Sequence, residues 1–339
     1  MKIGLLGASG YTGGELLRLL ESHPDFEPHF IGAFTHAGEK IINLHPQLVG
    51  YGDQLFDSMN VSKANECELL FLAMPHGESA AIVSQISGDK KIVDLGADFR
   101  LENSDSWERY YGGEHAGTWV YGMPELPGSR QKIAASSKIA NPGCYATAIA
   151  LGAFPALNVI NASDIVVVAA SGTTGAGRSP KVTLLGSEVM NSLTSYKFGG
   201  VHQHTPEIEE SLSRISNTKV GISFTPILAP MPRGILATIT ARLAKDISSS
   251  SLRELYRDAF MNEEFLSLLP EGMMPRTASV VGSNYVHVQV ALDEHSNRVV
   301  ISVAIDNLGK GAASQAIQNA NIMCGLKEDL GLKTYGVGV

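Results

Sequence analysis

The sequence has few cysteines, no long hydrophobic run and no excess of positive charge, and each absence excludes a class of protein. Its 339 residues include three cysteines and no C-x-x-C pair, so neither a disulfide framework nor a zinc site is expected. No apolar run approaches the ~20 residues that a membrane span needs. The net charge of −8 opposes broad attraction to nucleic acid. We therefore expect a small-molecule substrate, with no metal, nucleic acid or membrane partner.

The first ten residues, MKIGLLGASG, lead directly into a strand-like run and lack the basic and apolar regions of a signal peptide. This start favours a cytoplasmic protein. The chain length favours two domains and supports a large core.

Apolar runs alternate with helical or loop segments over the first hundred residues, which favours a parallel sheet with crossover helices and an α/β fold. The residues between 98 and 127 are expected to form loops. After a helix at about 145–157, strands that alternate apolar and polar residues are typical of a sheet with one exposed or subunit-facing side. A last helix is predicted at 311–326. The predicted strands are 2–7, 28–35, 68–75, 90–98, 164–171, 222–230, 234–243, 285–293 and 298–306.

Gly7, Gly10 and Gly13 form a G-x-x-G-x-x-G motif between a predicted strand and a predicted helix. Such glycines allow a tight turn and a close backbone approach, and the helix N-terminus offers free N–H groups to a pyrophosphate. The motif predicts a dinucleotide site, with structural glycines in a ligand-free turn as the alternative.

The end of the second predicted strand reads GAFTHAGEK and has no carboxylate where NAD sites usually hold the ribose 2′-hydroxyl. Thr35, His36 and Lys40 at this place are suited to a 2′-phosphate instead. We therefore predict NADP rather than NAD, although the same residues also suit an ordinary polar loop.

Cys144 directly follows Asn-Pro-Gly at the start of a predicted helix. A helix N-terminus lowers the pKa of a thiol, and its backbone N–H groups are available as oxyanion donors. Cys144 is therefore a candidate nucleophile. The alternative is the small buried hydrophobe that we expect of Cys67 and Cys324.

The segment GGVHQHTPEIEE supplies candidate proton-transfer groups for that thiol, namely His202, His204 and Glu207. A histidine pair with an acid also suits zinc, but no third strong ligand follows in the sequence, and a catalytic histidine fits a thiol better. Surface histidines without a role are the remaining alternative.

Ten stretches in this order resemble the N-acetyl-gamma-glutamyl-phosphate reductase family, within the aspartate-semialdehyde dehydrogenase-like group, from end to end. They are GASGYTGGEL, LHPQLVGYGD, FLAMPHG, VDLGADFRL, YGMPEL, NPGCYATA, SGTTGAGR, VHQHTPEI, FTPILAPMPRGIL and DNLGKGAASQAIQN. The resemblance implies an α/β fold with a Rossmann-type dinucleotide-binding domain and an α+β, glyceraldehyde-3-phosphate-dehydrogenase-like C-terminal domain. The first would comprise 1–143 and 311–339, and the second, 144–310, would carry catalysis and dimerisation in a homodimer or homotetramer.

The resemblance also implies a reaction: NADPH-dependent reduction of N-acetyl-L-glutamyl 5-phosphate to the 5-semialdehyde and phosphate, in arginine biosynthesis. Cys144 would form a thioester and His202 would act as acid and base. Tyr196, His204, Glu207 and Arg233 would lie around the substrate.

For the cofactor, the resemblance implies a larger set of residues from both ends of the chain. In SGTTGAGR, Thr174 replaces a family serine and keeps the hydroxyl, whereas His36 stands where the family often has an arginine. A structural salt bridge is the alternative for both Arg178 and Arg233. The implied cofactor residues are Gly7, Ser9, Gly10, Tyr11, Thr12, Gly13, Thr35, His36, Ser171, Gly172, Gly175, Ala176, Gly177, Arg178, Asn307 and Lys310.

Two enzyme alternatives share the thiol chemistry, namely aspartate-semialdehyde dehydrogenase and N-acetyl-aminoadipyl-phosphate reductase. A non-catalytic NADP-binding regulator is a third alternative, but such a protein would lack the cysteine or the histidine, and both are present.

Overall fold

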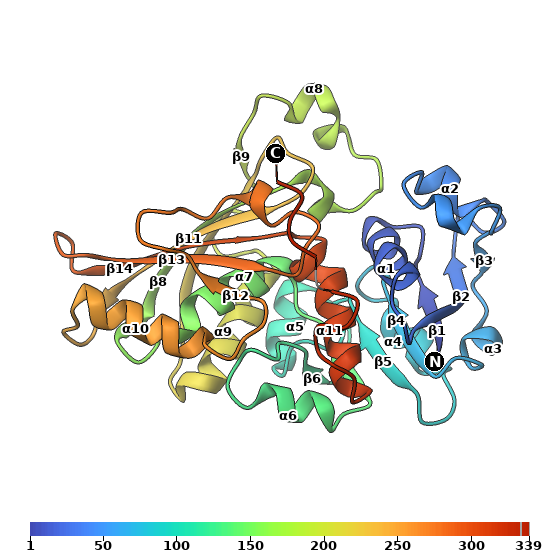
Figure 1. Cartoon of the computed structure of the whole chain (residues 1–339), viewed down its shortest axis with the longest axis horizontal. Coiled ribbons are helices and arrows are strands. Elements are labelled where there is room, and N and C mark those ends of the chain that lie inside the picture. Colours follow the sequence, from blue (N-terminus) through green and yellow to red (C-terminus); the bar gives the residue numbers. More distant parts are fainter. Residues whose placement is uncertain (333, 339) are drawn as a thin grey trace.

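The computed structural model describes residues 1–332 and 334–338, which form two seven-stranded sheets (Figure 1). The first sheet is entirely parallel and has the order β3-β2-β1-β4-β5-β7-β6. Its central strands are short runs of apolar residues, as expected of strands covered on both faces. The strands are β1 (Lys2–Leu6), β2 (Glu27–Ala33), β3 (Asp57–Ser58), β4 (Leu69–Leu72), β5 (Lys91–Asp94), β6 (Val120–Tyr121) and β7 (Lys138–Ala140).

The helices of this half pack on the sheet through apolar faces. In α1 the leucines at 16, 17, 19 and 20 are buried, as their helical spacing predicts. The last helix, α11, returns to the first sheet, where it contacts β5, α6 and α1 (Figure 1). The helices are α1 (Tyr11–Glu21), α2 (Ile41–Leu44), α3 (Val61–Ala64), α4 (Ser79–Val83), α5 (Ser104–Tyr110), α6 (Ser129–Ala134) and α11 (Ser314–Met323).

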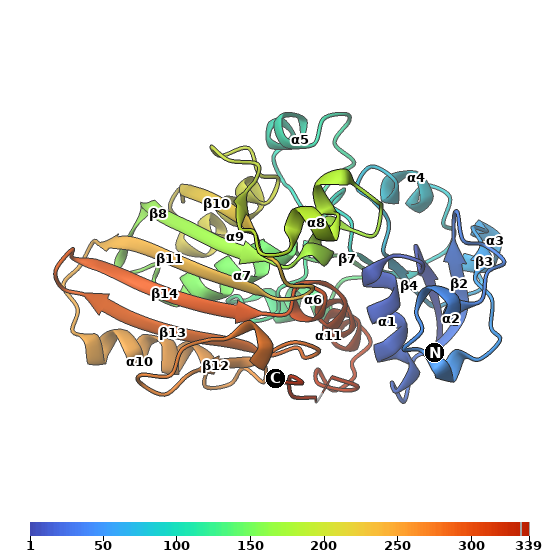
Figure 2. The ribbon, with the colours of Figure 1, turned by 90° about the horizontal axis from the view of Figure 1, so that it is seen from above.

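The second sheet is mixed and has the order β12-β13-β14-β11-β8-β10-β9. Helices α7 (Cys144–Ala153), α9 (His204–Ser216) and α10 (Ser249–Phe260) lie on one face of it, and α8 (Gly186–Val189) lies in a segment that projects from the body (Figure 1). The other face of the sheet is open (Figure 2), and on it Val166 and Val168 are 36% and 42% exposed, whereas Val167 is buried. The strands are β8 (Ile160–Ser171), β9 (Thr194–Ser195), β10 (Ile222–Leu228), β11 (Ile235–Leu243), β12 (Leu266–Leu268), β13 (Val286–Asp293) and β14 (Arg298–Ile305).

The α/β class and all nine predicted strands are confirmed. The expectation of loops between 98 and 127 is wrong, because this stretch contains α5 and β6. Helix α5 begins where the Asn103 side chain accepts a hydrogen bond from the Ser106 N–H at 2.9 Å, and it buries Trp107. The loop prediction followed from the glycines and aromatic residues of this stretch.

The chain passes from the first sheet to the second at Cys144 and returns after β14 through a π-helical segment, Gly309–Ala313. This path agrees with the sequence-based division into 1–143 with 311–339 and 144–310, whose boundaries stay a prediction. Among the described residues, no helix has the length and apolar character needed to cross a membrane.

Candidate active site

A cavity of about 1350 Å³ lies against the carboxyl ends of the parallel strands β1, β4 and β5, and residues from the second sheet complete its wall. Gly7 follows β1, Ala73 follows β4, and Leu95 follows β5, and all three line the cavity. This edge is where open parallel sheets bind ligands.

The cavity brings together most of the residues that the sequence singles out. Within the described part of the chain, five of the predicted residues lie outside the cavity lining: Gly13, Lys40, Glu207, Arg233 and Lys310. The predicted residues that line it are Gly7, Ser9, Gly10, Tyr11, Thr12, Thr35, His36, Cys144, Ser171, Gly172, Gly175, Ala176, Gly177, Arg178, Tyr196, His202, His204 and Asn307.

The three glycines of the N-terminal loop have different roles. Gly7 has a φ of +87°, and a Cβ there would lie 2.4 Å from the Ala73 carbonyl oxygen, so no side chain fits. A Cβ on Gly13 would lie 2.6 Å from Ala8 Cα, so this glycine serves the packing of α1 on the loop. Gly10 stands at the N-cap of α1, where the described residues provide no side-chain cap. The first N–H groups of α1 are thus left for an anion.

At the end of β2, Thr35 and His36 both line the cavity. The Nδ1 atom of His36 lies 3.1 Å from Glu39 Oε1. Lys40, the third residue expected to receive a 2′-phosphate, pairs instead with Asp53 at 2.6 Å. Two of the three expected residues therefore line the cavity.

Cys144 is the first residue of α7 and is packed closely from two sides. A Cβ on the preceding Gly143 would lie 2.4 Å from His204 Nε2 and 2.8 Å from Arg100 Nη1. A Cβ on Gly311 would lie 2.7 Å from Cys144 Cβ. Glycine is therefore required at both positions for the thiol, the imidazole and the guanidinium to come together.

The resting thiol differs from the sequence-based expectation. Burial raises the pKa of the Cys144 thiol to about 11, although the backbone N–H of Tyr145 and the charge of Arg100 both lower it. The helix N-terminus acts in the expected direction, but desolvation is the larger effect. Cys144 is therefore a neutral thiol at pH 7, and its attack requires removal of the proton.

Both histidines beside the thiol are neutral. Burial, with a smaller effect from His204, lowers the pKa of His202 to about 2, and burial together with Arg100 lowers the pKa of His204 to about 3. The Nδ1 atom of His202 accepts a hydrogen bond from the His204 backbone N–H at 3.1 Å, which places the ring proton of His202 on Nε2. Among the described residues, the buried Nδ1 atom of His204 has no hydrogen-bond partner.

Two tyrosines fix the histidine pair in place. The Tyr196 hydroxyl donates to the Tyr145 hydroxyl at 3.0 Å. The ring of His202 stands edge-on to both, with centroids 5.4 Å from Tyr145 and 5.8 Å from Tyr196. Because Tyr145 directly follows Cys144, this contact ties the histidine segment to the start of α7.

Glu207 lies behind the thiol loop, which corrects its predicted place beside the substrate. Its Oε1 atom accepts hydrogen bonds from the Gly143 N–H at 2.7 Å and from the Tyr121 hydroxyl at 2.8 Å. Its Oε2 atom accepts from Arg100 at 3.4 Å. The carboxylate thus holds the backbone that presents Cys144.

Arg233 was a candidate for the substrate phosphate or carboxylate, and its surroundings argue against that role. Its guanidinium donates to Glu15 at 3.0 and 2.9 Å and to Asp306 at 3.1 and 2.5 Å. Burial opposes ionisation of Glu15, but hydrogen bonds from Arg18 and Arg233 lower the pKa of Glu15 to about 2. Arg233 therefore forms salt bridges that join α1 to the end of β14. This arrangement favours the structural salt bridge over the substrate-binding role.

Lys310 likewise lies outside the cavity, which corrects its predicted contact with the cofactor. Its fully buried ammonium donates to Glu125 Oε1 at 2.5 Å and to Gln318 Oε1 at 2.6 Å. A buried charge of this kind is stable only with such partners.

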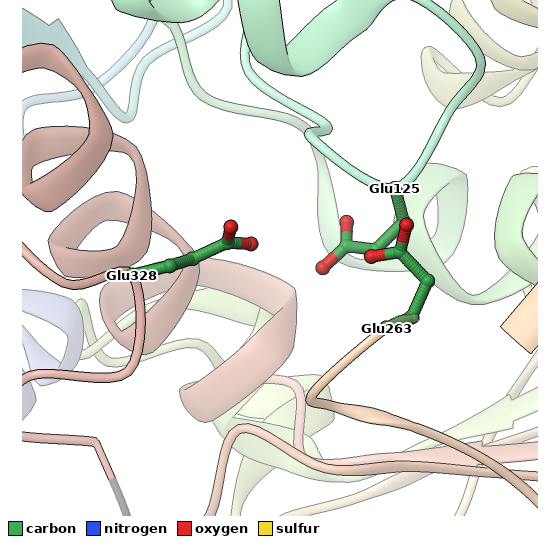
Figure 3. A group of neighbouring side chains, drawn as sticks. All are labelled: Glu125, Glu263 and Glu328. Atoms are coloured by element: carbon green, nitrogen blue, oxygen red, sulfur yellow. The ribbon is translucent and has the colours of Figure 1, made fainter. Parts of the chain in front are cut away.

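Glu125 belongs to a cluster with Glu263 and Glu328, whose carboxylate atoms lie within 4.8 Å of one another (Figure 3). Arg130 donates to Glu263 at 2.6 Å and to Glu328 at 2.7 Å. Together with Lys310, it supplies the positive charge between these acids. The cluster therefore joins distant segments of the chain through ion pairs.

Arg178 reaches from the second half of the chain to the first. It donates to the Leu44 carbonyl at 3.0 Å and to His45 Nδ1 at 3.2 Å, and its guanidinium carbon lies 4.8 Å from the centre of the Tyr11 ring. Its buried Nε atom has no partner within the described residues. This guanidinium stands beside the glycine loop with a free donor, as a binder of cofactor phosphates would.

Sequence reasoning missed several residues of the cavity wall. Arg100 and His76 come from VDLGADFRL and FLAMPHG, stretches that were recognised without a role for single residues. Both follow parallel strands, so the rule that ligands bind at carboxyl ends could have identified them. Lys181 and Lys197 also line the cavity, and their local sequence carries no comparable signal.

Family models match most of the chain. Residues 2–136 match a model described as the NAD binding domain of semialdehyde dehydrogenase, and residues 144–307 match its dimerisation domain.

Curated relatives match from end to end. A relative named N-acetyl-gamma-glutamyl-phosphate reductase from Acidothermus cellulolyticus is 52% identical over 99% of this chain and 98% of its own length. Another of the same name from Streptomyces avermitilis is 50% identical over 99% of both chains.

Solved structures share the fold at low identity. Aspartate semialdehyde dehydrogenase II from Vibrio cholerae, complexed with ASA, has a TM-score of 0.72 at 14% identity and covers 96% of this chain and 98% of its own. The aspartate semialdehyde dehydrogenase from Candida albicans with NADP has a TM-score of 0.66 at 17% identity and covers 95% and 98%. At these identities the likeness concerns the fold alone.

Proposed function

The chain belongs to the N-acetyl-gamma-glutamyl-phosphate reductase family of semialdehyde dehydrogenases, and from this membership we propose that it catalyses the reaction that names the family. In this reaction N-acetyl-L-glutamyl 5-phosphate is reduced to N-acetyl-L-glutamate 5-semialdehyde with release of phosphate. The step belongs to arginine biosynthesis. The observation that carries the proposal is the cavity in which Cys144, two neutral histidines and the glycine loop meet.

NADPH is the proposed reductant and supplies a hydride when it is bound. The residues fit a nicotinamide dinucleotide with a 2′-phosphate. The N-terminus of α1 and the Nε atom of Arg178, which have no side-chain partner among the described residues, offer donors to phosphates. Thr35 and His36 follow β2 at the place where NAD sites usually have a carboxylate, although His36 also contacts Glu39.

In the proposed mechanism, Cys144 attacks the acyl carbon and phosphate leaves, which gives a thioester. The thiol proton has to leave for this attack, and His202 is the proposed acceptor. In the free enzyme its low pKa makes it a weak base and its ring proton lies on Nε2, so the transfer requires that the bound anionic substrate raise the pKa of the ring and that the ring present an unprotonated nitrogen to the thiol. In its resting tautomer, the Nε2–H of His202 is a donor for the oxygen that gains charge when the thioester is reduced. The N–H groups at the start of α7 are the other donors. Collapse of the thiohemiacetal releases the aldehyde and restores the thiol.

Further proposals concern the whole protein. Residues 1–143 with 311–339 form the cofactor domain, and 144–310 form the catalytic domain. The open face of the second sheet, with Val166 and Val168 exposed, supports a homodimer or homotetramer, as does the match to a dimerisation domain. A cytoplasmic location accords with the small, soluble substrate and cofactor.

The reaction is tested in reverse, with N-acetyl-glutamate 5-semialdehyde, phosphate and NADP+. We expect phosphate-dependent formation of NADPH, and much lower kcat/KM with aspartate 4-semialdehyde or with N-acetyl-aminoadipate 6-semialdehyde. A preference for either of those aldehydes would replace the proposed substrate with the corresponding alternative.

The covalent step is tested with the acyl phosphate in the absence of reductant. Mass spectrometry is expected to find a thioester on the peptide that contains Cys144. Cys144→Ser should bind NADPH normally but show no adduct and no turnover. Near-normal turnover by Cys144→Ser would refute the covalent mechanism.

A further inference from the structure

The cavity is strongly basic although the chain as a whole is acidic. Its described lining includes four fixed cations, Arg100, Arg178, Lys181 and Lys197, and a single carboxylate, Glu188. The whole chain, in contrast, has a net charge of −8. Cations gathered in one cleft against the overall charge indicate anionic ligands. The proposed substrate and cofactor carry several such groups.

Two of the four cations are already engaged at defined places. Arg100 is paired with Glu207 and donates to the Asn141 carbonyl at 2.8 Å and to the Leu95 carbonyl at 2.9 Å. Arg178 stands over Tyr11 beside the glycine loop, at the cofactor end of the cavity. The two lysines remain, and the described residues show no acid paired with Lys197.

Lys197 is placed at the catalytic end by its neighbours. It directly follows Tyr196, whose hydroxyl bonds to Tyr145 beside the thiol. Its ammonium donates to the Oε1 atom of Gln203, the residue between His202 and His204. Its charge contributes to the low pKa of both histidines. The ammonium is thus held at the catalytic histidine segment by a neutral amide.

The backbone of Lys197 supports a built site. Its φ is +44°, in the left-handed region that few residues other than glycine adopt. A strained backbone conformation persists where the surrounding structure holds the residue in place, and such conformations are concentrated at ligand-binding sites. Two glycines with positive φ, Gly199 and Gly200, follow closely. Because glycine adopts a positive φ without steric strain, the turn could place this conformation at glycines alone. Burial and the nearby Lys181 lower the pKa of Lys197, and a bound anion would offset both effects.

From this placement we infer that Lys197 binds the α-carboxylate of the substrate and so selects an N-acyl amino acid over a simple aldehyde. The inference rests on the proposed function. In N-acetyl-glutamyl phosphate the α-carbon and two methylenes separate the reacting carbonyl from this carboxylate. A cation at the histidine segment suits that second anionic group. Gln203 holds the ammonium until the carboxylate takes its place.

The test compares two aldehydes that differ only in the carboxylate: N-acetyl-glutamate 5-semialdehyde and 4-acetamidobutanal. For the first, Lys197→Met should raise KM about 10- to 100-fold, the worth of one charge-assisted hydrogen bond, and change kcat by less than about threefold. The KM for NADP+ should not change. For 4-acetamidobutanal, wild type and Lys197→Met should have the same kcat/KM within about threefold, because the group that Lys197 binds is missing.

Two further variants separate a specific contact from a general effect. Lys197→Arg keeps the charge and should restore most of the affinity for the semialdehyde. Lys181→Met removes a cation from the same cavity wall and should leave that KM within about threefold of wild type. Equal losses with both aldehydes, or an unchanged KM in Lys197→Met, would overturn the inference while wild-type activity keeps the proposed function intact. Wild-type enzyme that turned over neither aldehyde would overturn both.

Discussion

Two groups of cations in this molecule have opposite surroundings. The interior cations, Arg233 and Lys310, are bonded to acids from distant parts of the chain, namely Glu15, Asp306 and Glu125. The cleft cations, Arg178 and Lys197, are bonded to neutral partners: a carbonyl and an imidazole for Arg178, and an amide for Lys197. Arg178, Arg233 and Lys310 lie in recognisable motifs and Lys197 does not, but of these four only the cleft pair keeps an unbalanced charge at the cavity.

The difference shows what decides whether a positive residue in a motif binds a ligand. A guanidinium or ammonium that is already bonded to carboxylates has its charge compensated, and removal of its partner would leave an uncompensated buried charge. A cation held by neutral groups can exchange them for an anion and gain charge-assisted hydrogen bonds. The interior cations should therefore control stability and the cleft cations should control affinity, which mutations can separate.

The largest expected effect concerns Lys310. Lys310→Met leaves Glu125 buried without its cation, and such a loss costs about 3–5 kcal/mol of unfolding free energy. Urea unfolding of the ligand-free protein measures this directly. The variant protein that remains folded should bind NADPH with an unchanged Kd, because the ammonium lies outside the cavity.

The double variant Glu125→Gln/Lys310→Met provides the control for that experiment. It removes both charges, so its loss of stability should be clearly smaller than that of Lys310→Met alone. A tenfold weaker NADPH affinity in either variant, with stability unchanged, would place Lys310 among the ligand-binding cations.

The two neutral histidines of the cleft predict a pH-dependent change in the unfolding free energy, which is the next effect in size. The pKa values of His202 and His204 in the folded chain, about 2 and 3, lie below the ordinary value near 6.5. Below pH 6.5 the two histidines bind protons in the unfolded chain but not in the folded chain. Their contribution to the unfolding free energy is therefore fully present above that pH and falls as the pH is lowered. Each histidine contributes a loss of about 2 kcal/mol at pH 5.

Denaturant titrations at pH 7.5 and pH 5 check this dependence. Because carboxylates elsewhere also affect acid stability, the relevant quantity is the difference between wild type and His202→Asn/His204→Asn. The double variant should lose less stability than wild type between the two pH values. Parallel losses would mean that these histidines take up protons in the folded state.

The sequence predicted the elements and residues that depend on local pattern. Apolar runs located the main strands, the glycine spacing located the turn after β1, and Asn-Pro-Gly located the start of α7 with its thiol. These features depend on neighbours within a few residues, so they are legible in a single sequence.

The charge states that the sequence could not reveal depend on residues that are distant along the chain. Arg233 meets Glu15 from 218 positions away, and Lys310 meets Glu125 from 185 positions away, so their neutralised state appears only after folding. The same holds for the Cys144 thiol, since its raised pKa comes from burial by segments that are not its neighbours in sequence. Local signals identified Cys144 as a cavity residue but not its charge state, and they assigned Arg233 and Lys310 to ligands because the acids that neutralise them are distant in sequence.

The smallest expected effect tests the cleft side of the comparison at Arg178. Among the described residues, the Nε atom of Arg178 has no partner and its other printed partners are neutral groups, so Arg178→Met should weaken NADPH binding about 10-fold, or about 1.4 kcal/mol. Fluorescence titration with NADPH measures the Kd.

Lys40→Met is a matched control, because Lys40 is close in sequence to Thr35 and His36 but is paired with Asp53. This variant should change the Kd by less than about twofold. The loss in Arg178→Met should shrink as salt is added, since ions screen the charge that attracts the phosphates. If Lys40→Met proved the more damaging change, the exposed ion pair and not the cation over Tyr11 would hold the cofactor, and neutral surroundings would no longer distinguish the residues that bind ligands.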